Sequence, residues 1–252
     1  MRILFVGDIY NELGKKAFAK YFSSCKQEYK PNFIIVNGEN IEKSNGLSLE
    51  TYKDYLSQGV NVFTLGNHAF SRSDYRDVLS LPNVVRPANY GKGTFGKEYV
   101  IVKYNDKSIA VINLIGRIFM HDATDSPFIK MDQLLEEIEA DYIIVDFHAE
   151  ATSEKYAMAY YLDGRVDAVI GTHTHVPTCD NIVLPKGTLY ISDVGMTGAK
   201  YSIIGGSIEQ GIRKFLTGVP ERVKPQKESL LQFNAVLLDL INKKIERINI
   251  FE

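Results

Sequence analysis

The chain has 252 residues, of which 45% are hydrophobic and 24% charged, close to the averages of globular proteins. This composition excludes a disordered or collagen-like chain, and a net charge of −2 gives no indication of a nucleic-acid-binding surface. Apolar runs stay short of the ~20 residues of a membrane-spanning helix. Asp8 follows an apolar run too short for a secretory signal, and Cys25 and Cys179 match no metal or redox spacing. We therefore expect a cytoplasmic protein with reduced thiols and no membrane partner.

Five short, β-branched apolar runs predict strands that are buried on both faces. In chain order they are Ile3–Val6, Phe33–Val36, Val62–Leu65, Tyr142–Phe147 and Val166–Ile170. Apolar residues recur at helical spacing in three further stretches, Leu13–Phe22, Leu134–Ile138 and Ile208–Leu216. The alternation of strands and helices predicts a largely parallel sheet with helices on its faces.

Other strand-like runs flank short polar turns, which is typical of hairpins. The three pairs are Glu98–Tyr104 with Ser108–Leu114, Ile182–Leu184 with Thr188–Ser192, and Leu230–Leu240 with Lys244–Phe251. Antiparallel pairs beside parallel strands predict two mixed sheets with helices outside. No internal repeat or linker-like composition interrupts the chain, so we expect a single domain over residues 1–252.

Polar side chains of the metal-binding kind fall at the ends of the five buried strands. They are Asp8, then Glu39 and Asn40, then Asn67 and His68, then His148, and finally His173 and His175. Each group alone has a simpler interpretation as a turn, a helix cap or a hydrogen-bonded core residue. Ligands bind outside the carboxyl ends of strands in open α/β sheets. Because so many ionisable groups are costly to bury without a partner, the five clusters together indicate a bound cation.

The number of candidate ligands indicates more than one ion. Seven side chains offer nitrogen or oxygen donors and no thiolate: Asp8, Glu39, Asn40, Asn67, His148, His173 and His175. A tetrahedral zinc site needs only three or four ligands, whereas two ions ~3.5–4 Å apart, bridged by one carboxylate, would use all seven. Imidazole and carboxylate donors suit manganese, iron, zinc or cobalt.

In this order the motifs resemble the signature of the calcineurin-like metallophosphoesterases. They are Gly7–Asp8, Gly38–Glu39–Asn40, Gly66–Asn67–His68, His148 and Gly171–Thr172–His173–Thr174–His175. Longer strings resemble the YmdB-like branch of bacterial phosphodiesterases, at Asn37–Asn40, Arg86–Asn89, Asp146–Glu154 and Asp193–Gly198. The resemblance covers nearly the whole chain and implies a four-layered α/β/β/α sandwich of two mixed sheets.

The resemblance also implies a role for each polar residue. Asp8, Glu39, Asn40 and His175 would hold the first ion; Glu39, Asn67, His148 and His173 would hold the second. His68 would not ligate but would face the phosphate. Because the departing oxygen needs a proton, we assign His68 the role of general acid, with a hydrogen-bond donor that only stabilises the transition state as the alternative. Two positions depart from the wider superfamily: Tyr10 replaces a histidine, whose place Asn40 must fill, and Ala69 replaces an acid, which leaves open what orients the His68 ring.

The implied activity is metal-dependent hydrolysis of 2′,3′- or 3′,5′-cyclic nucleotides such as cAMP, with two ions per chain, iron or manganese in the first place and zinc or cobalt as alternatives. The substrate is a small phosphodiester, and homodimers or homotetramers are compatible with the resemblance. Two alternatives stay open: a phosphomonoesterase or protein phosphatase, and a regulatory protein whose metal site is structural. Asp193 is interpreted as a member of a structural ion pair or turn.

Overall fold

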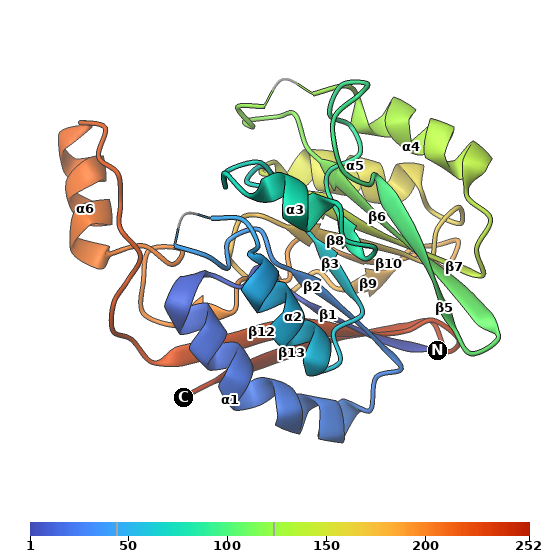
Figure 1. Cartoon of the computed structure of the whole chain (residues 1–252), viewed down its shortest axis with the longest axis horizontal. Coiled ribbons are helices and arrows are strands. Elements are labelled where there is room, and N and C mark those ends of the chain that lie inside the picture. The colour runs from blue at the N-terminus through green and yellow to red at the C-terminus, as the bar shows by residue number, and fades with distance from the viewer. Residues whose placement is uncertain (44, 123) are drawn as a thin grey trace.

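The computed structural model describes residues 1–43, 45–122 and 124–252, which form two facing sheets between two layers of helices (Figure 1). Helices α1 (Asn11–Tyr29) and α2 (Leu49–Ser57) lie on the outer face of one sheet. Helices α4 (Pro127–Glu137) and α5 (Thr152–Tyr161) cover the other sheet. The predicted four-layered sandwich is confirmed.

The first sheet has seven strands in the described ranges, and its central part is parallel. Their bounds are β1 (Arg2–Val6), β2 (Phe33–Asn37), β3 (Val62–Thr64), β4 (Val84–Val85), β11 (Gly198–Ala199), β12 (Leu231–Asp239) and β13 (Lys244–Phe251). Strands β1 to β4 run side by side in the same direction. Strand β12 pairs antiparallel with β1 and β11 and, as the sequence predicts, forms a hairpin with β13.

The second sheet contains six described strands and is also mixed. They are β5 (Tyr99–Tyr104), β6 (Lys107–Ile115), β7 (Tyr142–His148), β8 (Ala168–Thr172), β9 (Ile182–Val183) and β10 (Leu189–Ile191). Strands β6, β7, β8 and β10 are parallel, while β5 and β9 pair antiparallel at the two edges. Both edge pairs are hairpins that the sequence predicts.

Successive residues of a strand face opposite sides of its sheet and therefore belong to different hydrophobic cores. In β1, Ile3 and Phe5 pack between the two sheets, whereas Leu4 and Val6 pack under the first helical layer. A shift of one residue in the pairing of β1 would exchange these two sets, so that each would face the wrong layer. The register of β1 is therefore fixed by burial on both faces, and with it the position of the polar residues beyond its end.

Three helices were not predicted from the sequence. Helices α2 and α5 have nine and ten residues, and α3 (Tyr75–Leu79) has five; no apolar repeat was identified in these stretches. Ser48 supplies the start of α2, since its hydroxyl oxygen accepts a hydrogen bond from the Thr51 amide at 3.1 Å. In the described part of the chain, no helix is both long and apolar enough to cross a bilayer.

Helix α6 (Ile208–Thr217) forms as predicted but covers neither sheet. It projects from the body of the molecule, at the left of Figure 1. Its apolar residues stay exposed, with Phe215 at 79% and Leu216 at 81%. The expectation that this apolar stripe packs on a sheet is therefore wrong, and its exposure requires another explanation.

Candidate metal centre

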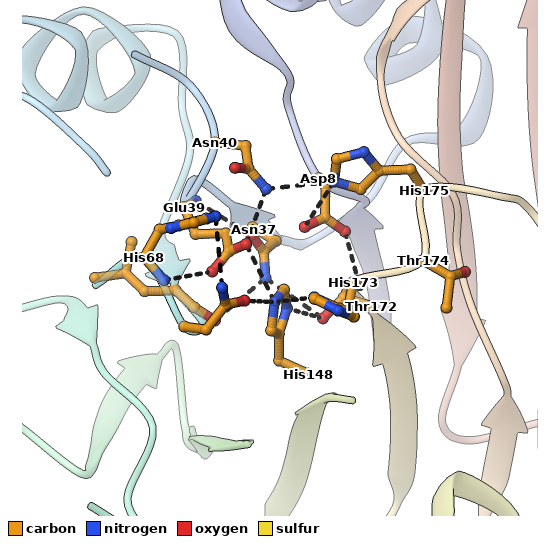
Figure 2. A network of polar contacts seen from close by, with 12 residues as sticks. Asp8, Asn37, Glu39, Asn40, His68, His148, Thr172, His173, Thr174 and His175 are labelled. Atoms are coloured by element: carbon orange, nitrogen blue, oxygen red, sulfur yellow. Dashed lines mark hydrogen bonds and ion pairs between the residues drawn. The ribbon is translucent and has the colours of Figure 1, made fainter. Parts of the chain in front are cut away.

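The carboxyl ends of β1, β2, β3, β7 and β8 bring the candidate ligands together, although these strands belong to two different sheets. In Figure 2 the side chains of Asp8, Glu39, Asn40, His148, His173 and His175 point toward one another, whereas Thr174 lies apart from them. The structure gathers all seven candidate ligands and His68 there; none of them is left elsewhere in the fold. Their role as metal ligands stays a prediction that the geometry can be tested against.

Three side chains converge on one nitrogen of His148. Its Nε2 lies 3.1 Å from Glu39 Oε1, 3.0 Å from Asn67 Oδ1 and 3.0 Å from His173 Nδ1. A ring nitrogen carries a single hydrogen or a single lone pair, so it cannot satisfy three neighbours by hydrogen bonding. Donor atoms of Glu39, His148 and His173 all lie within 4.8 Å of one another. This arrangement is typical of ligands that share a cation.

A second group of donors adjoins the first. Asn40 Nδ2 lies 2.8 Å from Glu39 Oε1 and 3.3 Å from His175 Nε2, which lies 3.9 Å from Asp8 Oδ1. Asp8 is fully buried, and among the described residues its Oδ1 has no hydrogen-bond partner. A buried carboxylate oxygen without a partner is costly. A cation at this point would satisfy it, and Glu39 Oε1 stands between the two groups as a bridging ligand would.

The buried charges of the centre influence one another. Burial raises the pKa of Asp8, although His175 and His148 oppose the shift. Burial tends to lower the pKa of His148, but the charge of Glu39 raises it to about 9. Burial and the neighbouring His148 lower the pKa of His173 to about 3, so its ring is neutral at pH 7. The carboxylates thus create a buried place that stabilises positive charge.

Hydrogen bonds through Nδ1 fix the orientation of two of the imidazoles, those of His148 and His175. His148 Nδ1 lies 2.9 Å from Thr172 Oγ1, whose hydroxyl donates to Asp146 Oδ1 at 2.7 Å. His175 Nδ1 lies 2.8 Å from the Ile204 carbonyl oxygen, which can only accept. In both rings the Nδ1 proton is therefore engaged, and Nε2 is left to face the centre. Such outer partners fix the tautomer of a ligating histidine.

The loop after β8 is strained and is held by a buried ion pair. His173 and His175 have φ angles of 103° and 67°, which non-glycine residues rarely adopt. The carboxylate of Asp193 accepts from the Thr174 amide at 2.9 Å and from Lys155 Nζ at 2.8 Å. The interpretation of Asp193 as a member of a structural ion pair is confirmed. Strain of this kind persists where the surrounding structure holds it.

His68 lies at the edge of the centre and is only half-buried. Its backbone N–H donates to Glu39 Oε2 at 3.2 Å, so His68 lies beside the Glu39 carboxylate. The ring Nδ1 lies 3.3 Å from the Ser71 hydroxyl, and Nε2 lies 3.4 Å from Asn67 Nδ2. Ser71 therefore takes the orienting place that the sequence leaves open at Ala69.

Several supporting residues were not identified from the sequence. Asp146, Thr172 and Lys155 are at most 1% exposed, and all of them contact a candidate ligand or the loop that carries one. One signal was present for Asp146: it lies two residues before His148 on the same strand, so both side chains point to the same face. No comparable signal marks Lys155, because its partner lies 38 residues away.

A family model described as YmdB-like protein matches residues 4–251 of the chain. The chain belongs to the YmdB-like family. A 2′,3′-cyclic-nucleotide 2′-phosphodiesterase of Bacillus subtilis is 45% identical over 256 residues, which cover 98% of this chain and 96% of that relative. The predicted family is confirmed, and the prediction of a phosphoric diester hydrolase is confirmed at the level of the family.

Two solved structures share the whole fold with this YmdB-like chain. A hypothetical protein from Thermus thermophilus is 43% identical, with a TM-score of 0.94 over 100% of both chains. A structure described as a novel phosphatase from Mycoplasma pneumoniae is 36% identical, with a TM-score of 0.93 over 100% of this chain and 94% of that one. The two-sheet architecture is therefore that of the family.

Proposed function

We propose that this chain hydrolyses 2′,3′-cyclic nucleotides at a centre of two metal ions. The observation that carries the proposal is the convergence of Glu39, Asn67 and His173 on Nε2 of His148. It occurs in a chain that is 45% identical to a 2′,3′-cyclic-nucleotide 2′-phosphodiesterase. The regioselectivity named for that relative is the one we propose here: the bond to the 2′ oxygen breaks, which leaves the phosphate on the 3′ oxygen. 3′,5′-Cyclic nucleotides such as cAMP are a second candidate substrate.

The donor set fits a pair of cations. Asp8, Glu39, Asn40 and His175 would hold one ion, and Glu39, Asn67, His148 and His173 the other. The unpartnered Asp8 oxygen and the crowded Nε2 of His148 are the two observations that support this fit. Nitrogen and oxygen donors without thiolate suit iron or manganese, and also zinc or cobalt. Two such ions, once bound, neutralise phosphate oxygens and lower the pKa of water towards neutrality.

The side chains of the centre then have separate tasks. Glu39 keeps the two groups of donors in register, because one of its oxygens contacts both Asn40 and His148. His68 lies beside the ligands Glu39 and Asn67 and lines the cavity above the centre, where the leaving 2′ oxygen of the substrate would lie. Its imidazolium would deliver a proton to that oxygen as the bond to phosphorus breaks. The Ser71 hydroxyl oxygen, 3.3 Å from Nδ1, can accept from the imidazolium and so hold the ring in position for this transfer.

The test combines metal analysis with substrate comparison. We expect about two equivalents of metal per chain, and turnover of 2′,3′-cyclic AMP above that of 3′,5′-cyclic AMP. Bis-p-nitrophenyl phosphate should be hydrolysed faster than the mono-ester, whereas the reverse order would indicate a phosphomonoesterase or protein phosphatase.

The variant Glu39→Gln should lose both metal and activity, because it weakens both ion sites together. Glu50→Gln, which changes an exposed carboxylate at the start of α2, is the control and should lose neither. Normal metal content with no hydrolysis of any phosphoester would instead favour a regulatory protein with a structural metal site.

A further inference from the structure

The cavity above the metal donors has two chemically different ends. It has a volume of about 560 Å³, within the range of roughly 300–1,000 Å³ that is typical of ligand sites. One end is formed by candidate ligands and His68. The other is formed by the segment that carries α6, mainly through the apolar residues Ile203, Ile204, Phe215 and Val223, with Lys214 beside Phe215. A substrate that fills this cavity would have one anionic part and one apolar part.

Ile204 is held in an unusual conformation at the apolar end. Its φ angle is 47°, in the left-handed region that a β-branched residue rarely occupies. The backbones of Ile203 and Gly206 bond to each other in both directions, at 3.0 and 2.8 Å, which closes the turn around Ile204. The turn leaves the Ile204 side chain 55% exposed, although an apolar side chain gains free energy by burial.

The same turn is attached to the metal centre. His175 Nδ1 donates to the Ile204 carbonyl oxygen at 2.8 Å, so a candidate ligand holds the turn directly. A Cβ atom at Gly205 would meet the Tyr10 ring at 2.5 Å, which shows how closely the turn approaches that ring. Tyr10 in turn packs edge-on against His175, with the ring centroids 5.2 Å apart. The apolar end is therefore fixed in position relative to the donors.

Phe215 brings an aromatic face to this end of the cavity. It lies on α6, lines the cavity and is 79% exposed. A free aromatic face beside a phosphate site is suited to stacking on a nucleobase, and stacking tolerates every base because each has a π-face. Leu216, the next residue, is equally exposed but is not among the described residues that line the cavity.

We infer that the turn at Ile204 and the Phe215 ring form the nucleoside subsite of this enzyme. The nucleobase packs against these two side chains while the cyclic phosphate faces the metal donors. This inference rests on the proposed function, since it assigns the part of the substrate that the metal centre does not bind. It also gives a reason for the exposure of Phe215 in the free protein.

The experiment compares two cyclic phosphodiesters that share a five-membered ring. One is 2′,3′-cyclic AMP, and the other is glycerol 1,2-cyclic phosphate, which has no base. Phe215→Ala should raise KM for 2′,3′-cyclic AMP roughly tenfold, a typical loss for one stacked base, with kcat nearly unchanged. KM for glycerol 1,2-cyclic phosphate should not change. Phe215→Tyr keeps the aromatic face and should restore the KM of the unaltered chain, and Leu216→Ala is the matched control.

Three results would overturn the subsite: an unchanged KM in Phe215→Ala, an equal rise for both substrates, or an equal rise in Leu216→Ala. If the unaltered chain hydrolysed glycerol 1,2-cyclic phosphate but no cyclic nucleotide, the phosphodiesterase would stand and the nucleoside subsite would be wrong. If it hydrolysed neither compound, the proposed function itself would fail, and the subsite with it.

Discussion

His148 and Thr172 are joined by a hydrogen bond of 2.9 Å, from the ring Nδ1 to the threonine hydroxyl oxygen. The hydroxyl proton is already used, because Thr172 donates to Asp146 at 2.7 Å. Thr172 can therefore only accept from the imidazole, and this places the ring proton on Nδ1. The Nε2 atom, which faces Glu39, Asn67 and His173, is then the nitrogen that can give up its proton and act as a ligand. One buried hydroxyl group thus determines the tautomer of His148.

Thr172→Val tests this relationship, because valine has nearly the shape of threonine but no hydroxyl group. We expect metal affinity to fall by roughly 10- to 100-fold, as for other residues that orient a ligating histidine. The fold should persist, since the buried volume is unchanged. Metal affinity is measured by titration of the metal-free protein with Mn²⁺, so the result does not depend on catalytic activity.

Thr172→Ser is the matched variant, because it keeps the hydroxyl group and removes a methyl group. It should bind metal nearly as tightly as the unaltered chain. If Val and Ser lowered the affinity equally, packing rather than the hydrogen bond would explain the effect, and the tautomer argument would be wrong.

Gly66→Ala should abolish metal binding by steric overlap alone. A Cβ atom at this position would collide with Glu39 Oε2 and with the His148 ring, both of which are fully packed. Gly38→Ala is a close control, since its Cβ would meet only ordinary contacts of 3.7 Å or more, although it precedes Glu39 directly. Elemental analysis of the two purified variants checks the prediction. Full metal content in Gly66→Ala would show that the donors are not packed as described.

The positions of the candidate ligands could be predicted because strand ends are strongly determined by the sequence. Runs such as Phe33–Val36 are buried on both faces, and the carboxyl ends of such parallel strands must meet at one edge of the two facing sheets. Glycine follows three of the five runs directly, at Gly7, Gly66 and Gly171, and Gly38 follows Phe33–Val36 after one residue. The candidate ligands could be identified although they lie far apart in the sequence, because each of them lies just beyond or at the end of a recognisable strand.

The parts that could not be predicted depend on contacts between distant segments. The pairing of Lys155 with Asp193 and the contact of Thr172 with Asp146 are set by the packing of neighbouring elements. The exposed position of α6 could not be predicted either. An apolar stripe such as that around Phe215 has the same sequence pattern whether or not another element packs on it. The apolar repeat identifies the apolar face of a helix but does not identify what packs against that face.

Metal loading should depend on pH through His148. Its pKa in the metal-free protein is raised to about 9, so at pH 7 the ring is protonated and a metal ion must displace that proton. Deprotonation favours binding, so apparent affinity should rise about tenfold per pH unit from pH 7 to about pH 9 and then level off. His173 adds no further proton in this range, because its pKa is lowered to about 3.

Calorimetric titration with Mn²⁺ in buffers of different ionisation enthalpy measures the protons released. We expect about one proton per chain from His148 at pH 7 and none from His173. An affinity that stayed constant between pH 7 and pH 9 would show that His148 is already neutral in the metal-free protein.

His68→Ala should keep the metal and lose rate in a way that depends on the leaving group. A general acid contributes about 10²–10⁴-fold to catalysis, and mainly where the departing oxygen is strongly basic. The variant should therefore lose most activity on 2′,3′-cyclic AMP and much less on bis-p-nitrophenyl phosphate, whose phenolate leaves readily. Equal losses on both substrates would point to a role in binding the phosphate, and unchanged turnover of the nucleotide would exclude the acid role.

The ion pair between Lys155 and Asp193 should contribute strongly to stability, because both groups are almost completely buried and lie 2.8 Å apart. Asp193→Asn would leave a buried ammonium group without its counter-charge and weaken the hold on the loop of His173 and His175. Removal of one partner of a buried pair typically costs about 3–5 kcal/mol in the free energy of unfolding. Urea denaturation of the metal-free protein measures this loss without a contribution from bound ions.

Glu221→Gln is the control, because it breaks the ion pair with Arg213 at the surface and should leave the unfolding midpoint unchanged. Similar midpoints for the two variants would mean that the buried pair does not hold the loop.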